Sequence, residues 1–251
     1  MEKPLPTGLV EALREARHVA VLTGAGVSAE SGLPTFREAQ TGLWARYDPE
    51  ELATPRAFRR DPALVWRWYA ERRRAALAAA PNPGHLALAA LEARVPRLTL
   101  ITQNVDGLHR RAGSRDPIEL HGDLTRARCS AEGTLYTSWD EAEPGPPPCP
   151  ACGAPLRPDV VWFGELLPEE ALARAWQAAA GCDLFLAVGT SGLVEPAASL
   201  PRVAYAAGAA VAVLNLDVQD SAEDRAYFLN GRSGALLPAL VAAAFPDAPA
   251  P

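Results

Sequence analysis

Four apolar segments of similar length constrain the fold of this chain more than any other feature. They are rich in Val, Leu and Ala, and each ends in small or polar residues: HVAVLTGAG at 18–26, RLTLITQNVD at 97–106, CDLFLAVGTSG at 182–192 and AAVAVLNLD at 209–217. Runs of this kind predict parallel strands that are buried on both faces of a sheet. Ligands of such sheets bind beyond the carboxyl ends of the strands, so we expect functional residues where these segments end.

Helical patterns separate these segments. The clearest begins at Asp61 and Pro62, an N-cap residue followed by proline at the first helical position, and it ends before the PNPG turn at 81–84. Helical spacing also occurs at 84–94, 168–180, 196–207 and 233–245. The alternation of strands and helices predicts an α/β fold with a Rossmann-like, doubly wound parallel sheet.

Two insertions interrupt this alternation. Residues 35–95 add a largely helical block, and residues 123–163 add a short block containing Cys, Pro and Gly. We predict that together they form a smaller lobe, helical in one part and zinc-ribbon-like in the other. The Rossmann-like domain is then expected from residues 1–34, 96–122 and 164–251. The run at 143–158 is compatible with a stiff polyproline linker, although its CPAC is at least as typical of a metal-binding turn.

The composition excludes several classes of protein. Apolar residues make up 49% of the chain and charged residues 22%, which excludes intrinsic disorder for most of it. Since no apolar run reaches the roughly 18 residues that span a bilayer, a membrane protein is not expected. The net charge of −6 lacks the basic excess of nucleic-acid binders. The N-terminal segment lacks the apolar core of a secretory signal, which favours a cytoplasmic protein, and we expect a monomer.

A glycine-rich turn follows the first strand segment. GAGVSA at 24–29 matches G-x-G-x-x-G/A, in which the first glycine permits a tight turn and the second lets the backbone approach a pyrophosphate at a helix N-terminus. Taken alone, the match fits an ordinary strand-to-helix turn equally well. A glycine and a proline further on interrupt the expected helix, so we interpret residues 32–37 as a flexible loop that acts as a lid on a ligand.

Five motifs occur in order along the chain: GAGVSAESGLPTFR, TQNVDGLH with HG at 121–122, VVWFGE, GTS and NLD. Together they resemble the motif set of the sirtuins, which are NAD-dependent protein-lysine deacylases. The resemblance covers roughly residues 18–237, and Leu33 stands where the family usually has Ile. It implies NAD as cofactor, acylated lysine side chains of proteins as substrates, and release of nicotinamide and O-acyl-ADP-ribose.

The resemblance implies catalytic roles for three residues. Asn104 would orient the ribose and a water, and Asp106 with Gln103 would contact the nicotinamide side. His121 is the expected general base, because an unperturbed imidazole pKa of about 6.5 allows it to accept a ribose hydroxyl proton near neutrality. Without the other motifs, a helix cap is the favoured explanation of Asp106. The remaining histidines, His18, His85 and His109, are expected to be structural.

The NAD-binding residues are expected in the glycine-rich turn, the loop after it and the ends of the later strands. They are Gly24, Ala25, Gly26, Ser28, Thr35, Phe36, Arg37, Gln103, Asn104, Asp106, Gly189, Thr190, Ser191, Asn215, Asp217 and Ser233. The acidic residue that usually follows a dinucleotide-binding turn by about 20 positions would be Glu50 or Glu51, which lie in the first insertion. Asp217 is therefore the candidate for contact with the adenosine ribose.

A modified lysine needs an apolar tunnel for its methylene stem and a backbone edge for its peptide. The residues expected on one side are Val161, Trp162, Phe163, Gly164 and Glu165, and those on the other are Gly192, Leu193 and Val194. Core packing alone would also explain the apolar members of this set, Val161 above all.

Tyr69 and Arg72 indicate the kind of acyl group. They are three residues apart and hence neighbours on one face of a helix, where a phenol and a guanidinium can bind a carboxylate together. The pair resembles that of the class III sirtuins, which prefer succinyl, malonyl or glutaryl lysine, and Ala53 adds the small side chain that such a pocket needs. The alternative is a solvated arginine face, because Arg72 begins a run of three arginines.

Three cysteines form an incomplete zinc signature. Cys149 and Cys152 make one CxxC unit, but the earlier unit has Cys129 and then Glu132 where its second Cys would stand. Three thiolates with Glu132 or water would still bind Zn²⁺, yet a structural site prefers four closed ligands, so zinc occupancy is doubtful from the sequence, the fourth ligand being missing. A bound metal would shape the smaller lobe. Cys182 is expected to be buried.

We therefore expect an NAD-dependent protein deacylase, a transferase of the sirtuin type, with desuccinylase or demalonylase activity and deacetylase activity beside it. Two alternatives stay open. Mono-ADP-ribosyl transfer would use the same cleavage of NAD with a protein nucleophile, and a catalytically idle NAD-binding module would keep the fold without the reaction. The presence of His121, Asn104 and Asp106 argues against the idle module.

Overall fold

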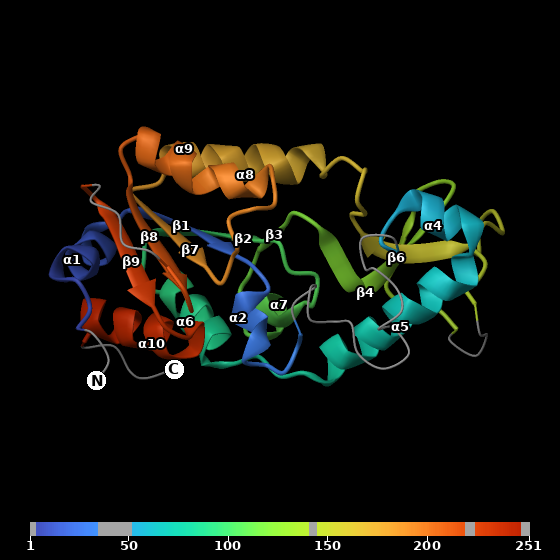
Figure 1. Cartoon of the computed structure of the whole chain (residues 1–251), viewed down its shortest axis with the longest axis horizontal. Helices are drawn as coiled ribbons and strands as arrows, with labels where there is room; N and C mark the ends of the chain where they lie inside the picture. Colours follow the sequence, from blue (N-terminus) through green and yellow to red (C-terminus); the bar gives the residue numbers. More distant parts are fainter. Residues whose placement is uncertain (1–3, 35–51, 141–144, 219–223, 247–251) are drawn as a thin grey trace.

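The larger unit of the chain is a six-stranded, all-parallel sheet with the strand order β3-β2-β1-β7-β8-β9 (Figure 1). The computed structural model describes residues 4–34, 52–140, 145–218 and 224–246. The strands are β1 (His18–Thr23), β2 (Arg97–Thr102), β3 (Ile118–Glu119), β7 (Leu184–Val188), β8 (Ala210–Asn215) and β9 (Ala226–Asn230). The four apolar segments supply β1, β2, β7 and β8, so the predicted doubly wound sheet is confirmed.

The strand order reverses between β1 and β7, which lie side by side in the middle of the sheet. Every residue of both strands is buried, as continuous apolar runs predict for strands covered on two faces. Their carboxyl ends are level, with Thr23 opposite Val188. At such a reversal the connections leave in opposite directions, and a crevice opens beyond the strand ends.

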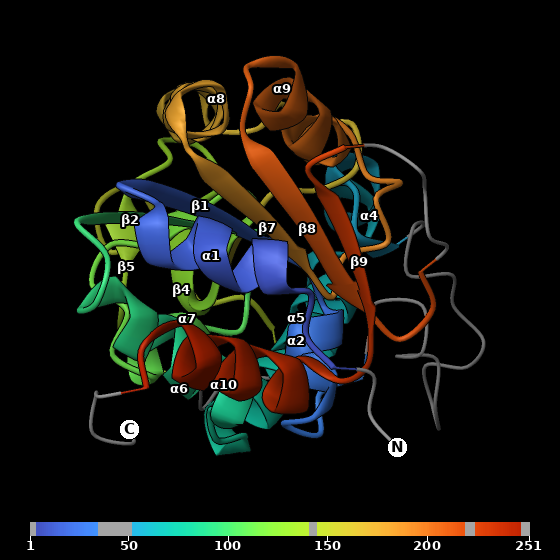
Figure 2. The same cartoon turned by 90° about the vertical axis from the view of Figure 1, so that its left-hand side faces the viewer.

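Helices cover both faces of this sheet (Figure 2). On one face, α1 (Thr7–Glu15), α6 (Pro83–Glu92) and α10 (Ser233–Ala244) pack around Leu88 and Leu237. On the other face lie α8 (Glu169–Gly181), the short 3-10 helix Ala197–Ser199 and α9 (Leu200–Ala206), which pack around Phe185. No helix in the described ranges is long and apolar enough to cross a membrane.

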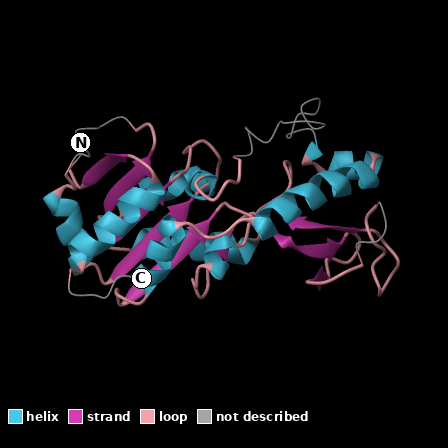
Figure 3. Cartoon of the chain, turned by 90° about the horizontal axis from the view of Figure 1, so that it is seen from below, coloured by secondary structure: helices cyan, strands magenta, loops and turns pink. Residues whose placement is uncertain are grey.

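The smaller unit is a three-stranded antiparallel sheet covered by two helices (Figure 3). Its strands are β4 (Gly122–Cys129), β5 (Leu135–Tyr136) and β6 (Leu156–Val160), and its helices are α4 (Pro55–Arg60) and α5 (Pro62–Ala78). The two meet in an apolar core that includes Phe58, Trp68, Leu124 and Trp162. Both predicted insertions therefore contribute to this smaller lobe.

One helix of the predicted helical insertion does not join the smaller lobe. Although α6 falls within residues 35–95, its apolar residues Leu88 and Leu91 are fully buried against α10 under the large sheet. The start of α5 is as predicted, since the Asp61 side chain accepts a hydrogen bond from the N–H of Leu64 at 2.9 Å. Two short helices, α2 (Gly26–Ala29) and α7 (Leu108–Arg111), follow β1 and β2 and carry site residues.

Candidate functional site

The glycine-rich turn lies directly against the carboxyl end of β7. The N–H of Gly24 donates to the Val188 carbonyl at 3.0 Å, and that of Gly26 donates to the Gly189 carbonyl at 2.9 Å. A Cβ on Gly24 would lie 2.7 Å from the Gly189 oxygen, and one on Gly26 would lie 2.8 Å from the Gly189 Cα. These glycines are therefore needed for the close approach of two strand ends, in addition to any approach of a pyrophosphate.

A hydrogen-bonded network joins this turn to the residues after β2. The Asn104 amide donates to the Gly24 carbonyl at 3.0 Å and to the Ser28 hydroxyl at 3.1 Å, and Ser28 in turn donates to Asp106 at 2.7 Å. The second carboxylate oxygen of Asp106 accepts from the N–H of Leu108 at 2.9 Å. Asp106 therefore accepts from the first N–H of α7, whose N-cap residue is Gly107, and also belongs to the network.

The same strand edge brings in residues from β7 and β8. The Gln103 side-chain amide donates to the Thr190 hydroxyl at 3.0 Å, and the Asn215 side-chain amide donates to the Thr190 carbonyl at 2.9 Å. Asn104 and Asp106 are 9% and 8% exposed. Burial raises the pKa of Asp106, and hydrogen bonds from Leu108 and Ser28 oppose that rise. A polar, poorly hydrated floor thus lies beyond the ends of β1, β2 and β7.

His121 lies beside this floor, between β3 and β4, with its Nδ1 atom 2.9 Å from the Gln103 carbonyl oxygen. Because a carbonyl only accepts hydrogen bonds, this contact places the proton on Nδ1 and leaves Nε2 free to accept one. Burial lowers the pKa of His121, and the hydrogen bond to Gln103 opposes this. The imidazole is therefore neutral at pH 7, which is the form a general base requires.

Gly122 explains why a glycine follows this histidine. Its φ is +83°, and a Cβ there would lie 2.1 Å from the carbonyl oxygen of Asp159, which pairs with β4 across the sheet. The pairing of β4 with β6 thus continues up to His121. The N–H of Val161 donates to the His121 carbonyl at 2.9 Å and extends this contact. The glycine of the HG motif is therefore required by backbone packing at the junction of the two lobes.

Gly122→Ala is expected to destabilise the fold by roughly 2–4 kcal/mol, because it adds both a strained φ and a clash with backbone. Thermal unfolding should show a Tm lower by roughly 5–15 °C. Gly133→Ala is the matched control, since Gly133 has a φ of +74° but no atom within 4 Å of an added Cβ. Equal losses in Tm for the two variants would contradict the packing explanation.

Two other histidines lie beneath the floor and were expected only to be structural. The rings of His85 and His109 are 4.8 Å apart between centroids and are buried. His85 Nε2 lies 3.5 Å from the Ser28 hydroxyl, and His109 Nε2 lies 2.9 Å from the Thr23 hydroxyl. Burial lowers their pKa values to about 4 and about 3, so both are neutral supports of the network. In the sequence, the only indication that His85 and His109 belong to this site is that they lie in the PNPGH and NVDGLH segments.

Two further predicted NAD-binding residues lie at the start of α10 and after β8, and three others are not described. The Ser233 hydroxyl donates a hydrogen bond to Glu30 at 2.9 Å, in a partly buried contact at the start of α10. Asp217 is exposed in the turn that follows β8. Thr35, Phe36 and Arg37, which form the second half of the predicted lid, lie outside the described residues.

The predicted substrate wall runs from His121 toward Ala53. The N–H of Phe163 donates to the Ala53 carbonyl at 2.9 Å, which ties the VVWFGE segment to the smaller lobe. Phe163 and Val194 are 46% and 44% exposed, and Gly164 is exposed as well, so core packing does not account for them. Val161 is half-buried, and Trp162 is buried in the core of the smaller lobe.

Tyr69 and Arg72 lie on the helix α5 as the spacing predicts. Arg72 is half-buried with its guanidinium 5.0 Å from the centre of the Trp68 ring, whereas Arg74 is exposed. Burial raises the pKa of Tyr69 well above its ordinary value, and the charge of Arg72 opposes that rise. A solvated arginine face therefore describes Arg74 and not Arg72. Sequence reasoning missed Phe58, which packs against Trp162 with ring centroids 5.3 Å apart.

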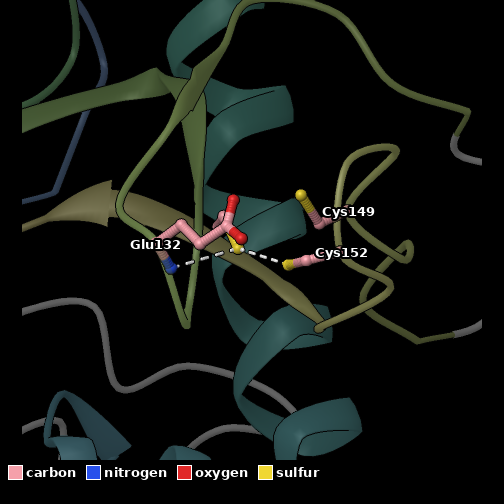
Figure 4. Close-up of side chains that lie close together, drawn as sticks. Glu132, Cys149 and Cys152 are labelled. Carbon is pink, nitrogen blue, oxygen red and sulfur yellow. Dashed lines mark hydrogen bonds between the residues drawn. The ribbon is translucent and has the colours of Figure 1, made fainter.

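The three predicted cysteine ligands meet at one end of the smaller sheet, together with Glu132 (Figure 4). The donor atoms of Cys129, Glu132, Cys149 and Cys152 all lie within 4.8 Å of one another. Glu132 thus places a carboxylate beside the three thiols, and three thiolates with one carboxylate fit the ligand types and number that Zn²⁺ takes. Cys182 is buried and lies outside this cluster, as expected.

Comparison with known proteins agrees with this geometry. The model of the Sir2 family matches residues 24–196. NAD-dependent protein deacylase 1 of Pseudomonas aeruginosa is 53% identical over 246 residues, which cover 95% of this chain and 98% of that protein. The crystal structure of a Sir2 homolog–NAD complex has a TM-score of 0.87 at 42% identity, covering 97% of this chain and 95% of that chain.

A structure of Sir2 bound to acetylated peptide is also similar, with a TM-score of 0.80 and 32% identity over 92% of this chain and 94% of that one. The family match spans more than half of the chain, and it includes the glycine-rich turn, the network around Asn104 and Asp106, His121 and the cysteine cluster. The chain therefore belongs to the Sir2 family, the sirtuins.

Proposed function

We propose that this chain is an NAD-dependent protein-lysine deacylase that prefers acidic acyl groups, such as succinyl and malonyl, and also removes acetyl. Its relatives at about half identity carry the name NAD-dependent protein deacylase, and a family member of similar structure holds NAD. One observation carries the proposal for this chain. A buried polar floor at the reversal of strand order lies beside an imidazole whose Nε2 is free to accept a proton.

Different residues of the chain would have different roles in the reaction. The glycine-rich turn and the start of α2 form the backbone surface that a diphosphate would approach. Asn104, held by Gly24 and Ser28, is positioned to orient a ribose, and Asp106 faces the same floor. NAD, as the second substrate, supplies a ribose carbon that the acyl oxygen can attack as nicotinamide leaves. His121 Nε2 then accepts a ribose hydroxyl proton, and one water, which Asn104 would orient, is consumed as free lysine and O-acyl-ADP-ribose are released.

The proposal is tested by incubating peptides that carry succinyl-, malonyl- or acetyl-lysine with the protein, with and without NAD, and measuring products by mass spectrometry. We expect deacylated peptide, nicotinamide and O-acyl-ADP-ribose only when NAD is present, with faster turnover of the acidic acyl groups. ADP-ribosylated protein without O-acyl-ADP-ribose would instead indicate mono-ADP-ribosyl transfer. Absence of any NAD turnover would indicate an idle binding module.

We also propose that Glu132 is the fourth ligand of a structural zinc site. Its backbone N–H donates to the Cys129 sulfur at 3.4 Å, so the turn that carries the carboxylate is already folded around this cysteine. The Tyr136 hydroxyl lies 3.1 Å from the Cys149 sulfur and supports that ligand. Zinc there would join the turn after β4 to the turn before β6 and would take no part in the reaction.

Glu132→Cys is expected to slow the loss of zinc to a chelator, since a fourth thiolate is a softer ligand than a carboxylate. Glu132→Ala should lower zinc retention below that of the wild type. Zinc content per chain after dialysis against a chelator measures both, and absorption of the Co²⁺-substituted proteins reports the added sulfur ligand directly. Zinc near zero in freshly purified wild type, or equal retention by Glu132→Ala, would overturn the assignment.

A further inference from the structure

A tight turn at residues 162–165, the 162–165 turn, ends the predicted substrate wall. The N–H of Glu165 donates to the Trp162 carbonyl at 2.9 Å, and Gly164 between them has a φ of +85°, a turn position that favours glycine. Trp162 is 2% exposed, whereas Phe163 is 46% exposed and Gly164 is exposed as well. The turn is therefore anchored in the core at its start and open to solvent at its centre.

The Glu165 side chain folds back onto this turn. Its carboxylate accepts from the backbone N–H of Trp162 at 2.8 Å and from two guanidinium nitrogens of Arg157 at 2.6 and 2.9 Å. Paired N–H···O bonds of this kind fix the plane of a carboxylate as well as its position. Both oxygens of Glu165 are thus bonded within the protein, so the side chain closes the turn on its buried side.

Arg157 on β6 joins the two ends of the 162–165 turn. Its side chain is 11% exposed, and its guanidinium lies over the Trp162 ring, 3.4 Å from the ring centre. It also donates to the Val160 carbonyl at 2.8 Å, on the strand that leads into the turn. A lysine has neither the planar fork nor the flat cation that these contacts use. One side chain thus holds the first residue of the turn, the last residue and the strand before them.

The turn that Arg157 holds is joined to both sides of the expected substrate site. The N–H of Val161 donates to the His121 carbonyl and that of Phe163 donates to the Ala53 carbonyl, both at 2.9 Å. The N–H of Gly164, at the exposed centre of the turn, forms no backbone hydrogen bond within the described part of the chain. An exposed backbone edge of this kind suits an extended peptide, which pairs through its main chain.

We propose that Arg157, paired with Glu165, is a positioning residue for peptide binding, which holds the 162–165 turn in the shape that receives the backbone beside the acyl-lysine. The inference rests on the proposed function and adds a residue that acts on the peptide, whatever its acyl group. Without the clasp the turn takes several shapes, and only the competent fraction of molecules binds, so the apparent peptide Kd rises by the inverse of that fraction.

The test measures binding of fluorescently labelled acyl-lysine peptides by anisotropy, which does not depend on turnover. For Arg157→Lys we expect the peptide Kd to rise about 10-fold, as for a turn that is competent in about a tenth of the molecules, and equally for succinyl- and acetyl-lysine peptides. A single acyl-lysine, blocked at both ends and assayed by displacement of the labelled peptide, should change its Kd by less than about twofold, since it has no flanking backbone to bind the turn.

Two further variants complete the test. Glu165→Gln keeps the size of the side chain and loses its charge, and it should raise the peptide Kd in the same way, with the double variant no weaker than the weaker single one. Arg115→Lys is the matched control, because Arg115 also bonds a carboxylate and a carbonyl, both of Glu92, away from the turn.

A peptide Kd unchanged in Arg157→Lys, equal weakening for the peptide and the single acyl-lysine, or additive losses in the double variant would overturn the positioning role. Equal weakening in particular would mean that the pair only maintains the lobe. Wild type that binds the peptide without NAD-dependent turnover would instead refute the proposed function, while the peptide Kd values would still decide the role of Arg157.

Discussion

Arg72→Met is expected to abolish desuccinylation, with kcat/KM for a succinyl-lysine peptide reduced by about 100-fold or more, while deacetylation persists. Removing one partner of a desolvated, hydrogen-bonded charge pair typically costs about 2–5 kcal/mol, because the other charge is left buried without a partner. Arg72 is half-buried, and burial lowers its pKa, so its charge lies in a poorly hydrated region. Methionine keeps an apolar contact with the Trp68 ring, over which the guanidinium lies.

Arg74→Met is the matched control, because it removes the same charge from the same helix at an exposed position. Steady-state kinetics with both peptides at saturating NAD separate the two outcomes. The control should keep both activities within about twofold, as expected for a solvated surface charge. Equal loss of desuccinylation and deacetylation in Arg72→Met would show that the residue maintains the lobe and does not recognise the acyl group.

The carboxyl ends of the strands could be predicted from the sequence, because a strand that is buried on both faces of the sheet accepts almost only apolar residues. Segments such as those of β1 and β7 contain almost only Val, Leu, Ala and Phe, and the polar residues begin where each strand emerges from the core. The short edge strands β3 and β9 were not expected from the sequence. With two residues, β3 is too short to form a pattern, and β9 is only partly covered.

Partners across the fold were harder to predict than the elements themselves. The spacing of apolar residues in α6 predicts a helix, but it does not tell whether the helix packs in the core of the smaller lobe or in that of the large sheet. In the structure, α6 packs under the large sheet. From the sequence, either Glu132 or a water could complete a site with the three cysteines, and in the structure the Glu132 carboxylate lies beside the three thiols.

Substitution of the expected base should have the largest effect on turnover of every substrate. His121→Gln keeps a side-chain N–H that can donate to the Gln103 carbonyl but removes the basic nitrogen. General-base catalysis typically contributes about 10²- to 10⁴-fold, so we expect kcat for succinyl- and acetyl-lysine peptides to fall together within that range. Peptide KM and Tm should change little, because the residue supplies a proton acceptor and no contact to the acyl group.

The pH profile distinguishes a base from a binding residue. Because burial lowers the pKa of His121, its neutral form persists below the ordinary imidazole value, and activity of the wild type should be lost only as the pH falls through that lowered pKa. The variant should lack this acidic limb. His18→Gln is the control, since His18 binds the Gly181 carbonyl and the Thr99 hydroxyl at the other end of β1. A variant that keeps the wild-type acidic limb would identify some other group as the base.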